Sequence, residues 1–188
     1  MTIETIRSFL RNYSPKTMND ASLTRAGVLM PFVGSEDGLS LLLTKRTDRV
    51  EHHKGQISFP GGAADDGDVD IVATALRETA EETGLTASAV EVLGKFDDFW
   101  TPTGFIITPV VGYLKHLPPL QLSSEEVEAV LQIPVSFFLD PTNERIVKME
   151  RNGTIHDVYF FRHGEHEVWG ATAAMIRSFL RMVLSSQS

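Results

Sequence analysis

Three glutamates in the middle of the chain, Glu78, Glu81 and Glu82, are spaced so that they would share one face of a helix. Residues three and four apart are neighbours on a helix surface, so these carboxylates would repel one another. A helix that needed only solubility would intersperse lysines, yet no lysine occurs between residues 55 and 94. Divalent cations would remove the repulsion, and carboxylate oxygens suit Mg²⁺ or Mn²⁺. The alternative is a solvated acidic face.

The helix that would position these glutamates has recognisable ends. Asp68 or Asp70 is predicted to cap its N-terminus, and Gly84 is predicted to stop it. Arg77 lies four residues before Glu81 and can pair with it. A second arc of the same helix is predicted to pack against the core, and it consists of Val72, Leu76, Thr79 and Thr83.

A glycine-rich bend at residues 59–62 (FPGG) precedes this helix. Gly61 and Gly62 have no side chain, so their backbone can approach a metal ion or a phosphate closely. The glycine-rich bend directly before the helix therefore favours a metal site over a solvated acidic face. No Gly-Lys-Ser/Thr follows the glycines, so the bend is not a phosphate loop of the Walker type.

The stretch 55–85 resembles the Nudix box, G-x5-E-x7-R-E-U-x-E-E-x-G-U, where U is a bulky aliphatic residue. The matching residues are Gly62, Arg77, Glu78, Glu81, Glu82, Gly84 and Leu85. Asp68 stands where the box has Glu, eight residues rather than seven separate it from Arg77, and Thr79 takes an aliphatic position. We therefore assign no role to Asp68.

The Nudix resemblance implies an α/β fold, an α/β/α sandwich with a mixed sheet and a central metal-binding helix. It also implies that Glu78 and Glu82 are the main Mg²⁺ or Mn²⁺ ligands and that Glu81 comes next. A carbonyl of Gly61 or Gly62 would complete the shell, as the family suggests. Arg77 would orient the carboxylates.

A second signature lies upstream, in residues 42–62. It resembles the L-L-T-x-R-[SA]-x3-R-x3-G-x3-F-P-G-G pattern of the coenzyme A pyrophosphatase branch of Nudix hydrolases, although Thr47 replaces Ser/Ala and Glu51 replaces the second Arg. The similarity continues through residues 108–112 and 168–170. It implies hydrolysis of coenzyme A (CoA) to 3′,5′-ADP and 4′-phosphopantetheine.

Two other functions stay open at this point. The Glu51 departure leaves room for ADP-ribose, NADH or another nucleoside diphosphate derivative as the substrate. A Nudix-fold ligand sensor without catalysis is the third reading. Such proteins usually lose box residues, and the Arg-Glu and Glu-Glu pairs at 77–78 and 81–82 are intact here.

Several residues outside the helix are candidates for substrate contact and proton transfer. Arg46 and Lys54 could contact phosphate, with surface ion pairs as the alternative. Trp100, inside the polar loop 97–104, could stack on adenine or cover a pantetheine arm. Glu126, with Glu125 beside it, is a candidate general base. The alternative for this pair is a capping box with the preceding serine, or exposed charge.

The histidines give weaker signals. His163 and His166 lack the helical spacing of a zinc protease and are predicted to flank a turn. His52 and His53 lie close to the bend and could contact phosphate, although a solvated loop is the better prediction.

Length and composition set the frame for these sites. A chain of 188 residues, 42% of them hydrophobic, predicts one domain over 1–188, with its core at about 24–184 and an N-terminal helical extension. A net charge of -8 argues against a general nucleic-acid surface, although bound metal would invert the local field. The absence of cysteine, a signal sequence and apolar runs of about 18 residues favours the cytoplasm and no membrane contact. Homodimer formation stays open.

Hydrophobic periodicity predicts the remaining elements. A hairpin is expected around residues 151–153 (RNG). Helices are expected at 1–13 and after residue 172, and strands at 26–33, 39–44, 89–96, 105–114, 130–135, 145–149 and 155–162.

Overall fold

A mixed sheet forms the centre of the molecule. The computed structural model describes residues 1–48, 55–151 and 153–187. Within these, the main sheet has eight strands in the path β3-β2-β1-β7-β5, with β4 beside β1, β6 beside β7 and β8 beside β2. Only β1 and β7 run parallel, and the mixed sheet is confirmed. The strands are β1 (Thr24–Ser35), β2 (Gly38–Arg46), β3 (Ile57–Ser58), β4 (Gly61–Ala63), β5 (Glu91–Lys95), β6 (Phe99–Trp100), β7 (Phe105–Leu114) and β8 (Val127–Pro134).

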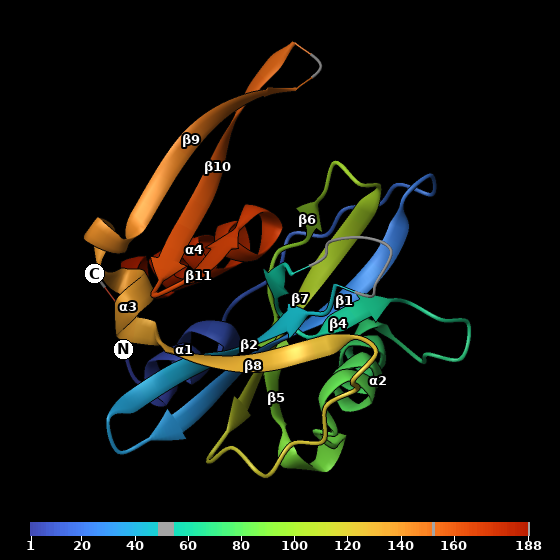
Figure 1. The fold of residues 1–188 in the computed structure, drawn as a ribbon, viewed down its shortest axis with the longest axis vertical. Helices are drawn as coiled ribbons and strands as arrows, with labels where there is room; N and C mark the ends of the chain where they lie inside the picture. The colour runs from blue at the N-terminus through green and yellow to red at the C-terminus, as the bar shows by residue number, and fades with distance from the viewer. Residues whose placement is uncertain (49–54, 152, 188) are drawn as a thin grey trace.

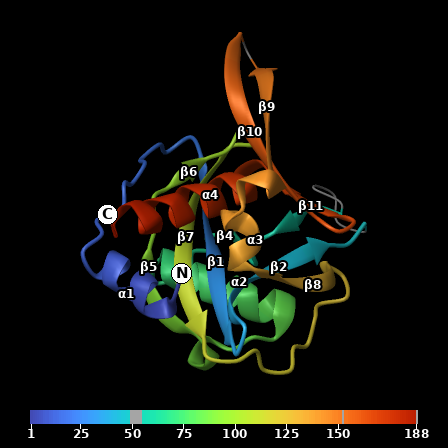
Figure 2. The same cartoon turned by 90° about the vertical axis from the view of Figure 1, so that its left-hand side faces the viewer.

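Helices cover both faces of this sheet (Figure 1). One face carries α2, and the other carries α1 and α4 (Figure 2). Successive side chains of β1 point to opposite faces of the sheet, so Leu29 packs in the cluster under α2 whereas Met30 packs in the cluster under α4. The α/β/α sandwich is therefore confirmed. The helices are α1 (Ile3–Arg11), α2 (Ile71–Thr83), α3 (Val135–Leu139) and α4 (Gly170–Ser185), with short 3-10 turns at Ala87–Ala89 and Pro141–Asn143.

The larger core lies between the sheet and the pair α1 and α4. Phe179 of α4 contacts Phe32 at 5.7 Å and Phe96 edge-on at 5.1 Å between ring centroids. Ile6 and Leu10 of α1 are buried in the same cluster, which also reaches to the end of α4. The predicted single domain over 1–188 stays a prediction, supported by this shared cluster.

A second sheet of three strands, in the order β11-β10-β9, stands beside the first. Its strands are β9 (Glu144–Arg151), β10 (Thr154–His163) and β11 (His166–Trp169). The predicted hairpin is confirmed, and β9 and β10 project from the body as a long ribbon (Figure 1). The sequence analysis missed β11, β6, β4 and α3, because each is too short for a periodic pattern to identify. Among the described residues, no helix is long and apolar enough to cross a membrane.

Candidate active site

Local signals define the helix α2. Asp70, rather than Asp68, is the N-cap, since its Oδ1 accepts from the Ala73 N–H at 2.8 Å. Gly84 ends the helix in the left-handed region at φ 71°. Thr79, the departure from the aliphatic pattern, is fully buried and donates its hydroxyl to the Ala75 carbonyl at 2.6 Å. The hydroxyl has its hydrogen-bond partner within the helix, so a threonine can be buried at the position where the box has an aliphatic residue.

The packing side of α2 differs in part from the predicted one. Thr79 and Thr83 are buried as predicted, whereas Val72 and Leu76 are only partly buried against the smaller core cluster. Thr74, Ala75 and Glu82 are buried as well. The helix is therefore turned so that one of its three glutamates faces inward.

The three glutamates differ sharply in burial. The exposed fraction of the side chain is 55% for Glu81, 20% for Glu78 and 3% for Glu82. A purely solvated acidic face would leave all three carboxylates in water. Instead, the exposure of the carboxylates falls from Glu81 at the surface, through Glu78, to the buried Glu82.

Glu82 is the most unusual group in the site. Its Oε1 lies 3.5 Å from Nη1 of Arg46, and its buried Oε2 has no hydrogen-bond partner among the described residues. The pKa of this carboxyl group is raised from 4.5 to about 7, chiefly by burial, with Glu126 and Glu78 adding to the rise and Arg46 and the Gly61 N–H opposing it. A buried carboxylate oxygen without a partner is costly unless the group takes up a proton or gains a ligand.

The glycine bend lies directly against Glu78. A Cβ atom added to Gly62 would sit 2.4 Å from Oε2 of Glu78, so a side chain there would push the Glu78 carboxylate aside. Gly61 has φ 149°, and a Cβ atom there would meet the Gly27 carbonyl oxygen at 2.4 Å. β4 holds the bend in place by pairing with β1 in the register Gly62↔Gly27. Backbone and carboxylate oxygens therefore share one small region.

This region fits a hard divalent cation. It offers an unpartnered carboxylate oxygen on Glu82, a second carboxylate on Glu78 and a glycine bend whose backbone lies close to the Glu78 carboxylate. Within the described ranges, no three acidic, histidine or cysteine side chains already converge in a way that could hold a metal ion. Arg77 pairs with two of the carboxylates, because its Nη1 contacts Glu78 at 2.8 Å and Glu81 at 3.1 Å.

Asp68, to which the sequence analysis assigned no role, is held tightly in this region. Its two oxygens accept from Nε and Nη2 of Arg77, each at 2.9 Å, in a two-pronged pair. The Thr74 hydroxyl at 2.8 Å and the Asp65 N–H at 3.0 Å also donate to it. Arg77 holds the pKa of Asp68 well below its usual range. The one-residue longer loop lets the shorter side chain reach Arg77, so the departures in length and residue type offset each other.

Glu126 is brought to α2 by the loop before β8. The Ser123 N–H donates to the Glu82 carbonyl at 2.9 Å, and the Thr47 N–H donates to the Glu126 carbonyl at 2.9 Å. Glu126 is half-buried and close enough to raise the pKa of both Glu82 and Glu78. Glu125 is exposed, and residues 124–126 form a turn with no helix after it, so the capping-box alternative is wrong.

Arg46 also reaches the site, because of an irregularity in its strand. The register between β2 and β8 shifts between Lys45 and Arg46, which marks a β-bulge. The bulge directs the guanidinium of Arg46 to Glu82. Lys54, the other predicted phosphate contact, and the positions of Glu51, His52 and His53 lie outside the described residues.

Trp100 does not join this cluster. It lies in β6 with 50% of its surface exposed. β6 pairs with β7, β7 with β1, and β1 with β4, so Trp100 is about three strand spacings, or roughly 14 Å, from the glycine bend. His163 and His166 flank the predicted turn, facing each other at the end of the β10–β11 pair.

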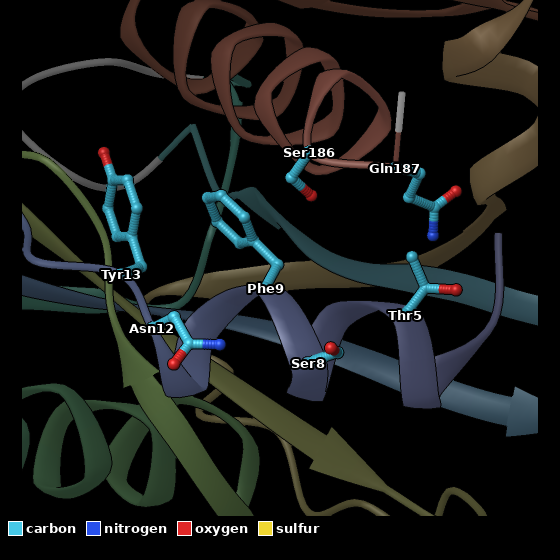
Figure 3. Close-up of a pocket in the computed structure, with 7 residues that line it drawn as sticks. All are labelled: Thr5, Ser8, Phe9, Asn12, Tyr13, Ser186 and Gln187. Atoms are coloured by element: carbon cyan, nitrogen blue, oxygen red, sulfur yellow. The ribbon is translucent and has the colours of Figure 1, made fainter.

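A hollow of about 360 Å³ lies between α1 and the end of α4 (Figure 3). Its described lining includes the side chains of Thr5, Asn12 and Gln187, and none of the lining residues is charged. A pyrophosphate group needs cations, so this hollow does not serve the predicted chemistry.

The sequence and the structure are both similar to known proteins. The NUDIX domain family matches residues 23–164. A protein of Photorhabdus laumondii named "Uncharacterized Nudix hydrolase NudL" is 36% identical over 169 residues, which cover 90% of this chain and 89% of that protein. A protein of the same name from Yersinia pestis is 37% identical over 163 residues, or 87% of this chain and 81% of that protein.

Solved structures share the fold at low sequence identity. A NUDIX hydrolase from Alicyclobacillus acidocaldarius has a TM-score of 0.61 at 20% identity, covering 88% of this chain and 93% of that one. The MutT protein from Methanosarcina mazei Go1 has a TM-score of 0.57 at 17% identity, covering 91% of this chain and all of that one. At these identities the likeness shows the fold alone.

Proposed function

Because the chain belongs to the Nudix hydrolase family and is a pyrophosphohydrolase of nucleoside diphosphate derivatives, we propose that it hydrolyses the pyrophosphate bond of CoA and its derivatives. The products would be 3′,5′-ADP and 4′-phosphopantetheine or its acylated form. One observation carries the proposal: Arg46, from the upstream CoA-type signature, lies 3.5 Å from Glu82 of the Nudix helix. The two sequence signatures therefore meet in one site.

Glu78 and Glu82 are proposed to hold the divalent cation, with Glu81 next and a carbonyl of Gly61 or Gly62 completing the shell. The all-oxygen donor set favours Mg²⁺ or Mn²⁺. When bound, such a cation would neutralise charge on the leaving phosphate and acidify the attacking water. The unpartnered Oε2 of Glu82 supports this assignment, because a ligand oxygen without a partner is what an ion site leaves behind.

Three side chains are proposed to act around that centre. Arg46 is placed to contact a substrate phosphate with its two-pronged guanidinium. Arg77, fixed by Asp68, orients the carboxylates of Glu78 and Glu81. Glu126 is the proposed general base, accepting a proton from the attacking water on a carboxylate oxygen. Its nearness to Glu78 and Glu82 supports this role. A phosphate contact by Lys54 stays a prediction.

The rival substrates are ADP-ribose, NADH and other nucleoside diphosphate derivatives, and Glu51 is the feature that favours them. A panel separates them: the protein is incubated with CoA, ADP-ribose, NADH and a nucleoside triphosphate, with Mg²⁺ or Mn²⁺, and the products are identified by mass. Glu82→Gln is assayed beside it, with Glu36→Gln, an exposed residue in the β1–β2 turn, as the control.

We expect 3′,5′-ADP from CoA, loss of turnover in Glu82→Gln and full activity in Glu36→Gln. Preferred cleavage of another substrate would overturn the CoA assignment but keep the metal helix. No cleavage of any substrate, with metal-independent ligand binding, would restore the sensor reading. A Trp100 contact with substrate, a homodimer and a cytoplasmic location stay predictions, and sedimentation of the purified chain tests the second.

A further inference from the structure

A second groove lies beside the proposed active site. It has a volume of about 360 Å³ and runs between the β3 edge of the main sheet and β11 of the second sheet. None of the residues assigned to the metal centre lines it. Its described lining includes Lys45, Ile57, Glu165, His166, Glu167 and Trp169.

Trp169 gives this groove a flat aromatic wall. Its ring stacks on Phe160, with the centroids 6.0 Å apart and the planes within 9° of parallel. The residue nevertheless keeps 41% of its surface exposed. An indole fixed on one side and open on the other is a platform on which a nucleobase can stack.

The charges in the groove favour a base over a phosphate. Lys45 is already paired with Glu128 at 2.7 Å, and Arg145 at 3.1 Å pairs with Glu167. Glu165 adds a further negative charge, so an anionic phosphate would meet repulsion. Carboxylate oxygens suit the exocyclic amine of adenine, which donates hydrogen bonds.

The groove and the metal centre lie at two sides of the same strand end. Arg46 faces Glu82 of α2, whereas Lys45, the preceding residue, lines the groove. Ile57 also lines the groove, and four residues later the chain reaches Gly61, a span of at most about 14 Å. A nucleotide with its phosphates at α2 can therefore reach around the end of β2 and β3.

We propose that this groove binds the adenine ring of the substrate, stacked on Trp169. The inference rests on the proposed function only in taking an adenine nucleotide as the substrate, so it holds for CoA and for ADP-ribose alike. It replaces Trp100, on the far side of β1 and β7, as the base-stacking residue.

The two tryptophans of the chain make a direct test. Trp100→Phe leaves Trp169 as the only indole reporter, and Trp169→Phe leaves Trp100. Each full-length variant is titrated with AMP, 3′,5′-ADP and pantetheine in EDTA, and tryptophan fluorescence is followed without turnover. Circular dichroism confirms that both variants are folded. Trp169→Ala is titrated in competition with a fluorescent adenine nucleotide.

We expect AMP and 3′,5′-ADP, but not pantetheine, to quench Trp100→Phe and to leave Trp169→Phe unchanged. Trp169→Ala should weaken nucleotide binding about tenfold or more. Quenching that persists in Trp169→Phe, a response to pantetheine alone, or no response in Trp100→Phe would overturn the inference. Failure of CoA hydrolysis in the substrate panel would leave these titrations unaffected, so the two proposals fail separately.

Discussion

Replacing Glu82 by glutamine should stabilise the metal-free protein while abolishing its activity. The side chain is 3% exposed, and its Oε2 has no hydrogen-bond partner within the described residues. In the absence of metal, the folded state must therefore either bury an incompletely paired negative charge or take up a proton. Glutamine keeps the shape of the side chain and cannot ionise, so the variant avoids both of these costs.

The magnitude follows from the pKa of Glu82. Burial raises it from its ordinary value of 4.5 to about 7, so the folded state binds the proton more tightly than the unfolded chain does. Below pH 4.5 both states are protonated and the charge costs nothing. Between pH 4.5 and 7 stability falls as pH rises, and above pH 7 the loss is complete at about 3 kcal/mol. The gain from Glu82→Gln should therefore be near zero at pH 4.5 and about 3 kcal/mol at pH 8.

Thermal unfolding in EDTA at the two pH values measures this difference. For a chain of this size about 3 kcal/mol corresponds to a rise in Tm of roughly 6–12 °C. Glu36→Gln, an exposed control, should shift neither value by more than about 1 °C. Added Mn²⁺ should then raise the Tm of the wild-type protein and leave Glu82→Gln unchanged, because the cation stabilises only a state that binds it.

An equal effect of Glu82→Gln at both pH values would refute the reasoning, since only ionisation makes the difference depend on pH. A variant less stable than wild type at pH 8 would show that the carboxylate is a net structural contact. A variant that still gains stability from Mn²⁺ would remove Glu82 from the ligands.

Three further substitutions test the neighbours of this carboxylate. Asp68→Asn should lower kcat at least tenfold, while circular dichroism shows no loss of helix. Because the pKa of Asp68 is low in the folded state, its carboxylate stabilises the fold above about pH 4, and this stabilisation is lost as the pH falls. The variant should therefore lack this part of the acid-induced loss of stability. Gly62→Ala should abolish Mn²⁺ binding by calorimetry, because its Cβ atom would fall 2.4 Å from the Glu78 carboxylate. Arg46→Lys should lower kcat/KM about tenfold in the CoA assay, because lysine lacks the two-pronged phosphate contact.

The sequence predicts those parts of the site whose geometry is local. Asp70 and Gly84 specify the ends of α2, whereas the spacing of the three glutamates does not show that Glu82 alone among them is buried. The pairing of Arg77 with Glu81 follows from the same spacing and is confirmed. These features depend on neighbours within one or two helical turns, which a linear pattern records directly.

The sequence does not predict features that depend on contacts across the fold. The burial of Glu82 requires Arg46 from β2 and the loop that carries Glu126, both distant along the chain. Trp169 becomes a groove wall only because β11 lies beside β3. Asp68 was missed for a different reason, since a longer loop and a shorter side chain each break the expected pattern while together they restore the contact with Arg77.

The cost of Glu82 is itself evidence for its role. About 3 kcal/mol is a large share of the 5–15 kcal/mol that typically separates folded from unfolded protein, and one substitution would remove it. Two other departures lie beside it, because Gly61 adopts a backbone conformation that side chains disfavour and a Cβ atom at Gly62 would displace the Glu78 carboxylate. Several unfavourable features that gather at one place in a fold indicate a functional site. A cation bound between these oxygens would remove the penalty at Glu82, so the proposed ligand would account for the most costly of these departures.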